Sequence, residues 1–263
     1  MNHFLEKARQ GGVLGTMLSE LNSPNLPRIF RACGFDFLIL DCEHGYFDYT
    51  SAANLIAVSR LCGLFPIVRI PLAGRENVQK YLDMGAAGLL LAMTETREQA
   101  EQLVALAKYP PQGKRGISLQ RPHSDYCPGD AGAYLEKANR ETVLFAQIES
   151  QAGVSNAAAI AGVPGIDGII IGPNDLTLDL GCVGQYDHPD VVRIFRFLAG
   201  TAASCQKLCG LISSSLPLLE RWKKEGFSLL SWNSEIGMLL NEGKRGVRLL
   251  KAAEGATVSI EGR

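Results

Sequence analysis

The sequence predicts an α/β fold, a single-domain (β/α)8 barrel of 263 residues. Short apolar β-rich runs alternate with longer helical patterns along the whole chain, and eight runs are enough to close a barrel. Because helices separate the strands, the connections have crossover length and the strands pair in parallel. An open doubly wound sheet is the alternative fold, but no Gly-x-Gly-x-x-Gly motif follows the first strand.

The predicted strands are short and largely apolar, as buried parallel strands are. They cover residues 13–18, 35–40, 65–70, 88–93, 143–148, 165–171, 210–213 and 227–231. The helical patterns end at glycine or proline in most cases. They cover residues 25–33, 50–62, 76–84, 97–108, 131–139, 153–161, 189–207 and 216–225, and a last helix begins at Glu235.

Composition excludes several classes of function. With 26 basic and 27 acidic residues the formal charge is −1, which speaks against nucleic-acid or membrane-surface binding. The longest apolar stretches fall well short of the roughly 20 residues of a membrane helix. Seven cysteines without a Cys-x-x-Cys pair predict a cytoplasmic protein with reduced, mostly buried thiols, such as Cys33, Cys42, Cys62 and Cys209. Residues 260–263 spell a protease-cleavage linker and are set aside.

Polar side chains gather where the predicted strands end, which is where barrels build active sites. In chain order these ends supply Ser19, Glu20, Asp41, Glu43, His44, Arg69, Gln147, Glu149, Asp175, Ser213, Ser214, Ser215, Trp232, Asn233 and Glu235. Each has a simpler interpretation, because a carboxylate often caps the next helix and Arg69 could bridge to Asp41 or Glu43. So many charged groups at one end of a core cost desolvation energy, which favours a functional role.

The residue types at these ends suit enolate chemistry on a 2-keto acid. Glu149 and Asp175 follow adjacent strands, and two hard oxygen ligands suit Mg²⁺ or Mn²⁺, which polarise a ketone. Arg69 can bind a carboxylate or stabilise an enolate oxygen. His44 follows Asp41 by three residues, and a nearby carboxylate can tune an imidazole as a general base.

The chain resembles the HpcH/HpaI aldolase family, metal-dependent pyruvate aldolases related to the citrate lyase β subunit. The segments that carry the resemblance are LDCEHG, VRIP, KYPPQGKRG, QIES and GIDGIIIGPNDL. They lie within a stretch that extends from near Gly15 to near Leu250. The resemblance implies that Glu149 and Asp175 hold a divalent metal (Mg²⁺, Mn²⁺ or Co²⁺) and that Arg69 contacts the enolate oxygen of bound pyruvate.

Further roles follow from the same resemblance. It implies that His44 and Asp41 form the catalytic base dyad. It places Gln147 beside the metal, and it implies that the turn formed by Gly172, Pro173 and Asn174 holds the pyruvate carboxylate. Family members form hexamers, as trimers of dimers, and exchange a C-terminal helix between barrels. Asp83 matches a residue that reaches the site of a neighbouring subunit.

The sequence departs from the family pattern at the end where a second reactant would bind. Glu20 replaces a small or apolar residue, Arg121-Pro122-His123 replaces Arg-Ala, and SWNSE replaces a Gly-Ser-Asp pattern. We therefore expect Glu20, Ser213, Trp232 and Asn233 to contact a polar second reactant. Alternatively, Trp232 fills a gap in the barrel and the serines cap the helix near residue 216.

The leading hypothesis is reversible, metal-dependent aldol cleavage of a 4-hydroxy-2-keto acid. In the cleavage direction the 4-hydroxyl proton passes to the His44 system and pyruvate enolate remains. One alternative is condensation of oxaloacetate with acetyl-CoA to citrate, as in family relatives of siderophore synthesis. Another is a barrel that binds without catalysis, although the intact set of Asp41, His44, Arg69, Glu149 and Asp175 argues against it.

Overall fold

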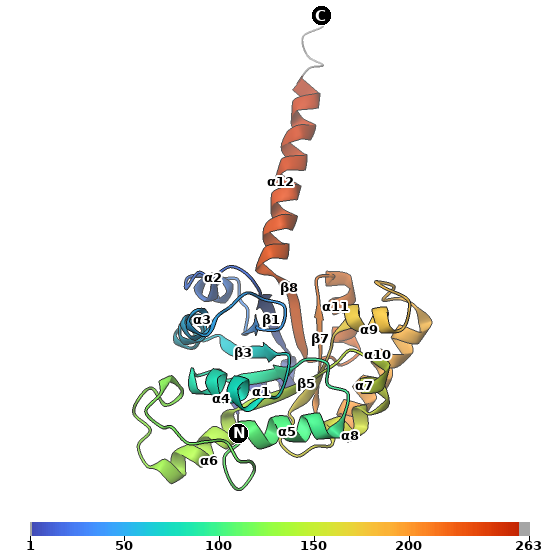
Figure 1. The fold of residues 1–263 in the computed structure, drawn as a ribbon. Coiled ribbons are helices and arrows are strands. Elements are labelled where there is room, and N and C mark those ends of the chain that lie inside the picture. Colours follow the sequence, from blue (N-terminus) through green and yellow to red (C-terminus); the bar gives the residue numbers. More distant parts are fainter. Residues whose placement is uncertain (1, 258–263) are drawn as a thin grey trace, which may run out of the picture.

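The computed structural model describes residues 2–257 and confirms the predicted (β/α)8 barrel (Figure 1). The eight strands pair in parallel in chain order, and pairing of the first with the last closes the barrel. The strands are β1 (Val13–Leu18), β2 (Phe37–Asp41), β3 (Phe65–Ile70), β4 (Gly88–Leu91), β5 (Val143–Ile148), β6 (Gly168–Ile171), β7 (Leu208–Ser213) and β8 (Leu229–Ser234).

Helices surround the barrel and connect its strands (Figure 1). They are α1 (His3–Gly11), α2 (Leu26–Ala32), α3 (Tyr49–Leu61), α4 (Arg75–Asp83), α5 (Arg97–Ala107), α6 (Ala131–Glu141), α7 (Gln151–Ser155), α8 (Ala157–Ala161), α9 (Pro173–Asp179), α10 (Pro189–Ser204), α11 (Leu216–Lys224) and α12 (Glu235–Thr257). A capping box begins α5: the Thr96 side chain accepts from the Gln99 N–H, and the Gln99 side chain accepts from the Thr96 N–H.

Two apolar layers follow from the alternation of side chains along each strand. On β2, Phe37 and Ile39 belong to the cluster that fills the barrel, whereas Leu38 and Leu40 pack in the layer beneath the helices. The next residue of the inward series is Asp41, which pairs in register with Arg69 of β3. The same alternation that fills the barrel therefore aims charged side chains inward at its upper end.

Helix α1 closes the amino-terminal end of the barrel, and it was not among the helices expected from the sequence. Its buried residues Phe4, Leu5 and Ala8 join the cluster that fills the barrel. The Phe4 ring stacks on Phe65, with ring centroids 4.0 Å apart and planes 8° apart. This end of the barrel is thus packed with apolar side chains.

Several expectations need correction. The helix expected over residues 153–161 is divided at Asn156 into α7 and α8, and α9 was missed. Cys209 is buried and Cys42 and Cys62 are partly buried, but Cys33 is exposed, because it follows the short helix α2 at the surface. Residues 260–263 lie outside the described residues.

Helix α12 extends away from the barrel (Figure 1). Large apolar side chains along it are exposed, among them Leu239, Leu240, Val247, Leu249 and Leu250. Within residues 2–257, no helix combines the length and the apolar character needed to cross a bilayer.

We predict that Phe4→Ala destabilises the fold without impairing the site at the opposite end. Removing a buried Phe typically costs about 3 kcal/mol or more, because a cavity remains. Chemical denaturation should show this loss in the free energy of unfolding, with His3→Ala, which changes an exposed neighbour on α1, as the control. A comparable loss of turnover per folded molecule would contradict the purely structural role.

Candidate active site

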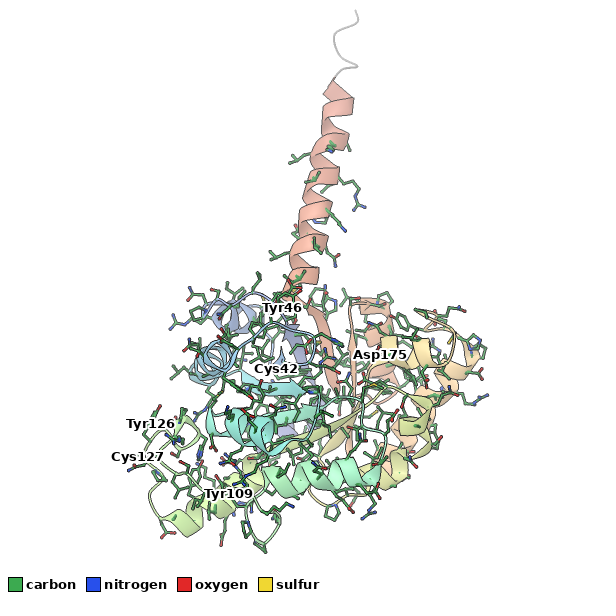
Figure 2. The ribbon with its side chains drawn as sticks, viewed as in Figure 1. Cys42, Tyr46, Tyr109, Tyr126, Cys127 and Asp175 are labelled. Carbon is green, nitrogen blue, oxygen red and sulfur yellow. The ribbon has the colours of Figure 1, made fainter. Side chains whose placement is uncertain are left out.

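The side chains singled out in the sequence gather at the carboxyl ends of the strands, with Asp83 and the segment of His123 as the exceptions. Figure 2 shows Cys42, Tyr46 and Asp175 at the end of the barrel from which α12 projects, and Tyr109, Tyr126 and Cys127 toward the other end. Parallel strands have all their carboxyl ends on one side, so residues distant in sequence meet there. We refer to this side as the carboxyl end of the barrel.

A buried two-point ion pair lies at the centre of the site. Arg69 Nε donates to Asp41 Oδ1 at 2.9 Å, and Arg69 Nη2 donates to Asp41 Oδ2 at 2.6 Å. The third guanidinium nitrogen, Nη1, lies 3.3 Å from Glu43 Oε2. The bridge that was the alternative interpretation of Arg69 is therefore present, and it fixes the guanidinium plane at the end of β3.

This pairing keeps both groups charged despite their burial. Burial acts to raise the pKa of Asp41, but hydrogen bonds and charge from Arg69, with the N–H groups of Glu43 and His44, hold it below its usual value. Burial acts to lower the pKa of Arg69, and Asp41 and Glu43 raise it instead. The site thus contains a permanent, desolvated positive charge facing the barrel interior.

His44 is placed differently from the dyad that the resemblance implies. The carboxylate of Asp41 accepts from the backbone N–H of His44 at 3.3 Å and of Glu43 at 3.0 Å, and its remaining contacts go to Arg69. The His44 side chain is 71% exposed, and its Nε2 lies 3.9 Å from Glu43 Oε2. Asp41 therefore holds the backbone of the His44 loop, and Glu43 is the carboxylate near the ring.

Glu43 is a residue whose role the sequence did not assign. Burial raises its pKa, while Arg69 and His44 act to lower it and Asp41 and Asp175 act to raise it. Glu43 therefore interacts electrostatically both with the ion pair and with Asp175. Its position two residues after Asp41, just beyond the end of β2, was the available signal.

Glu149 is a buried carboxylate at the end of β5. Its Oε2 accepts from Gln147 Nε2 at 2.5 Å, and its Oε1 accepts from the Met93 N–H at 2.7 Å. Burial raises its pKa to about 7; the Met93 hydrogen bond opposes the shift, and the charges of Glu43 and Asp175 add to it. Met93, which follows β4 with φ of 44°, is a further contributor that the sequence did not indicate.

Asp175 and the Gly172 turn complete this part of the site. Asp175 lies in the first turn of α9 and is exposed at the carboxyl end of the barrel. A Cβ at Gly172 would lie 2.1 Å from Glu149 Oε2 and 2.8 Å from Gln147 Nε2, so any other residue here would displace these two side chains. Pro173 is the first residue of α9, and Asn174 Oδ1 accepts from the Tyr186 hydroxyl at 2.6 Å.

These residues fit a divalent cation with an incomplete protein ligand set. Within residues 2–257 no group of three or more His, Cys, Asp or Glu side chains is arranged to hold a metal. Glu149 and Asp175 would therefore be two oxygen ligands among several, the others being water and substrate, as Mg²⁺ commonly has. A cation would also offset the repulsion among the carboxylates around Glu149. The buried Gln147 Oε1 has no hydrogen-bond partner and is a further oxygen beside this position.

The residues expected to contact a second reactant are mostly engaged in packing or capping. Trp232 Nε1 donates to the Ser214 carbonyl at 3.3 Å, and its ring lies 6.5 Å from Phe35. Ser213 Oγ accepts from the Ser215 N–H, and the Ser215 side chain caps α11. These contacts are those of the alternative interpretation, and a role toward substrate stays a prediction.

Asn233 and Glu20, the other two residues expected to contact a second reactant, are placed differently from Trp232 and Ser213. Asn233 has φ of 58°, its Oδ1 accepts from the Ser234 N–H, and its buried Nδ2 has no partner. Glu20 is exposed, in the loop after β1. Both are therefore at the carboxyl end of the barrel, and Glu20 is the more accessible of the two to a second reactant.

Asp83 lies outside this site. It is the last residue of α4, and its carboxylate accepts from Arg115 Nη2 at 2.7 Å. Helix α4 begins after β3 and returns to the amino-terminal end of the barrel, so Asp83 is distant from the carboxylates of its own chain. Its role toward a neighbouring subunit stays a prediction.

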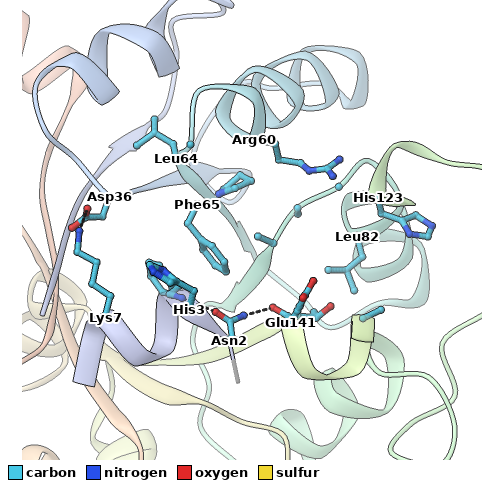
Figure 3. A pocket seen from close by; sticks show the side chains of 18 of the residues that line it. Asn2, His3, Lys7, Asp36, Arg60, Leu64, Phe65, Leu82, His123 and Glu141 are labelled. Carbon is cyan, nitrogen blue, oxygen red and sulfur yellow. Dashed lines mark hydrogen bonds and ion pairs between the residues drawn. The ribbon is translucent and has the colours of Figure 1, made fainter. Parts of the chain in front are cut away.

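A cavity of about 650 Å³ lies at the amino-terminal end of the barrel, away from these residues (Figure 3). Helix α1, the beginning of β3 and the end of α6 border it, and its charged groups include Lys7 paired with Asp36 and Arg60 paired with Asp125. None of the carboxylates predicted to bind a metal, nor Arg69 or His44, is among the residues that line this cavity.

Comparisons with known proteins agree with this architecture. The family model for HpcH/HpaI aldolase/citrate lyase matches residues 16–241. A 5-keto-4-deoxy-D-glucarate aldolase of Shigella sonnei (strain Ss046) is 33% identical over 220 residues, which are 84% of this chain and 85% of the relative. The relative of the same name from Escherichia coli O139:H28 has the same identity and coverage.

Solved structures give the same result. The HpcH/HpaI aldolase from Desulfitobacterium hafniense DCB-2 has a TM-score of 0.90 and 31% identity, covering 94% of this chain and 95% of its own. The citrate synthase SbnG has a TM-score of 0.85 and 25% identity, covering 96% and 98%. On this evidence, the chain belongs to the HpcH/HpaI aldolase/citrate lyase family and is a carbon–carbon lyase of the aldolase type.

Proposed function

We propose that the enzyme cleaves a 4-hydroxy-2-keto acid, with a divalent cation as cofactor, through a pyruvate-type enolate. The observation that carries the proposal is the buried Arg69 guanidinium beside the crowded carboxylates of Glu43, Glu149 and Asp175. The names of the relatives describe the same pattern, because a 5-keto-4-deoxy acid has its ketone beside a carboxylate and, on the far side of the deoxy carbon, a hydroxyl.

Each residue has a definite task in this reaction. A cation held by Glu149 and Asp175 would act as a Lewis acid on the keto group. Arg69 presents N–H donors where negative charge develops on the enolate oxygen. Because Asp41 already holds the guanidinium in place, no free energy is needed to reorient it during the reaction. The exposed His44 ring accepts the 4-hydroxyl proton, and Glu43, 3.9 Å away, stabilises the imidazolium that results.

The second candidate is condensation of oxaloacetate with acetyl-CoA to give citrate. It is supported by the similarity to the citrate synthase SbnG at 25% identity. Both reactions need an enolate of a small acid or thioester and a polar pocket for the other reactant. They differ in which reactant loses its proton, and this difference can be measured.

Exchange of the pyruvate methyl protons with solvent tests the aldolase proposal directly. We expect wild-type protein with Mg²⁺ or Mn²⁺ to exchange these protons in ²H₂O, as followed by NMR, and to cleave 4-hydroxy-2-keto acids. Glu149→Gln should abolish both activities, since it removes a charged oxygen ligand. The control is Glu101→Gln, which alters an exposed carboxylate paired with Arg97 on α5.

The outcomes separate the two candidates. Exchange that is independent of metal, or that survives in Glu149→Gln at low metal concentration, would contradict the ligand assignment. Citrate formation from oxaloacetate and acetyl-CoA, without exchange or cleavage of keto acids, would favour the second candidate instead.

Arg69→Lys should lower turnover by about 10²-fold or more. Lysine retains the charge but cannot donate two parallel hydrogen bonds to Asp41 and present a third nitrogen to the substrate. Steady-state kinetics would show this, with Arg97→Lys on the surface of α5 as the control. If Arg69 serves only as a bridge to Asp41, the lysine variant will keep near-wild-type turnover.

We also propose that the enzyme is a homo-oligomer in which α12 packs on another copy of the chain. The helix has 23 residues, and its exposed apolar side chains contact no other part of the described chain that would cover them. Leu239 is 60% exposed and Leu250 is 70% exposed, which is costly for side chains of this size unless a partner covers them.

The double variant Leu239→Glu/Leu240→Glu should shift the enzyme to a smaller assembly. Charged side chains would have to be buried at the contact, which strongly disfavours association. Light scattering coupled to size-exclusion chromatography measures the mass, and Glu242→Gln on the same helix is the control. An unchanged mass in the double variant would show that this face of α12 does not form the contact.

A further inference from the structure

The first turn of α12 carries a buried carboxylate with no assigned role. Glu235 is 2% exposed, and its Oε1 accepts from the backbone N–H groups of Ser19 at 2.9 Å, Glu20 at 2.6 Å and Leu21 at 3.1 Å. Its Oε2 accepts from the Ser19 N–H at 3.1 Å, and the Ser19 hydroxyl lies 3.3 Å from Oε1. One carboxylate side chain thus fixes three consecutive residues of the loop after β1.

The loop after β1 in turn holds the loop after β2. The Ser19 carbonyl accepts from the Tyr46 N–H at 3.1 Å. A Cβ at Gly45 would lie 2.6 Å from that carbonyl and 2.1 Å from the carbonyl of Asp41, so the two loops meet backbone to backbone. Figure 2 shows Tyr46 close to the base of α12, in agreement with this chain of contacts.

The His44 ring lies on this second loop, between its two anchors. On one side, Asp41 accepts from the N–H groups of Glu43 and His44; on the other, Tyr46 is bound to Ser19. The ring itself makes no hydrogen bond to any residue in the range 2–257, and Glu43 at 3.9 Å is its charged neighbour. The position of the ring is therefore determined by the backbone of its loop.

From these contacts we infer that Glu235 is a positioning residue for His44. It acts through Ser19 and the loop after β2, and it does not touch the substrate. The inference rests on the proposed function, in which His44 accepts the substrate proton. It also connects the root of α12 to the reacting groups, because Glu235 is the first residue of that helix.

The experiment is a double-mutant cycle with Glu235→Gln and His44→Ala. Glutamine keeps the size of the side chain but loses the charge, and its amide group would face N–H donors. We expect the kcat of aldol cleavage to fall by about 10-fold to 10²-fold, since small displacements of a reacting group have effects of this size. KM for the keto acid should change little, because Arg69, Glu149 and Asp175 are held by other strands.

In the His44→Ala background, Glu235→Gln should produce no further loss of kcat, because the group that it positions is gone. Glu242→Gln, an exposed carboxylate of α12 paired with Arg245, should leave kcat unchanged in both backgrounds. Thermal unfolding of every variant identifies losses caused by unfolding. If Glu235→Gln does not yield folded protein, Glu235→Asp, which keeps the charge on a shorter side chain, takes its place in the cycle.

Two results would overturn the inference while leaving the proposed function intact. One is an equal loss of kcat from Glu235→Gln in both backgrounds, which would mean that Glu235 supports the fold or another group. The other is unchanged kcat in Glu235→Gln when His44→Ala is impaired. A fully active His44→Ala variant would instead contradict the proposed role of His44, and the inference would fall with it.

Discussion

The buried ion pair between Arg69 and Asp41 organises the carboxyl end of the barrel. Neither charge would be stable there alone, because removing an ion from water costs several kcal/mol that only a well-placed partner offsets. The pairing register of β2 and β3 brings the two residues side by side. Asp41 Oδ1 also accepts hydrogen bonds from the backbone N–H groups of Glu43 and His44, in the loop after β2. The guanidinium and the His44 loop are thus fixed by one carboxylate.

The charges around this pair do not balance within the chain. Glu43, Glu149 and Asp175 act on one another electrostatically, and the Arg69 guanidinium beside them is already paired with Asp41. The charges of Glu43 and Asp175 add to the raised pKa of Glu149. Structural ion pairs are seldom left with such a surplus, whereas sites for cations commonly have one. The surplus explains why the same residues suit a divalent metal together with an anionic keto acid, whose charge Arg69 can offset.

The sequence was sufficient to predict the barrel, because its strands appear as short apolar runs separated by helical patterns. It was also sufficient to predict which residues lie at the carboxyl end, because these follow directly where each apolar run stops. It was insufficient for α1, which has only Phe4, Leu5 and Ala8 as apolar side chains, so that its burial depends on the barrel that it covers. The partner of the His44 ring could not be deduced either. Spacing suggested Asp41, but the backbone turns after β2, and Glu43 is the carboxylate near the ring.

The site also separates into a rigid part and a part that can vary. Arg69, Gln147 and Glu149 lie on or directly after β3 and β5, where a change of position would disturb the register of the barrel. Glu20 lies in a loop, and Asn233 lies beside an irregularity in the pairing of β1 with β8, where the register shifts between Gly15 and Met17. Residues in such places can change without disturbing the ladders of the other strands. A family can therefore keep one enolate-forming centre while the side chains that meet the second reactant diverge. Glu20, Trp232 and Asn233 are departures of this chain that lie in that variable part, whereas the departure at His123 lies elsewhere, with its ring 3.8 Å from the Asp83 carboxylate.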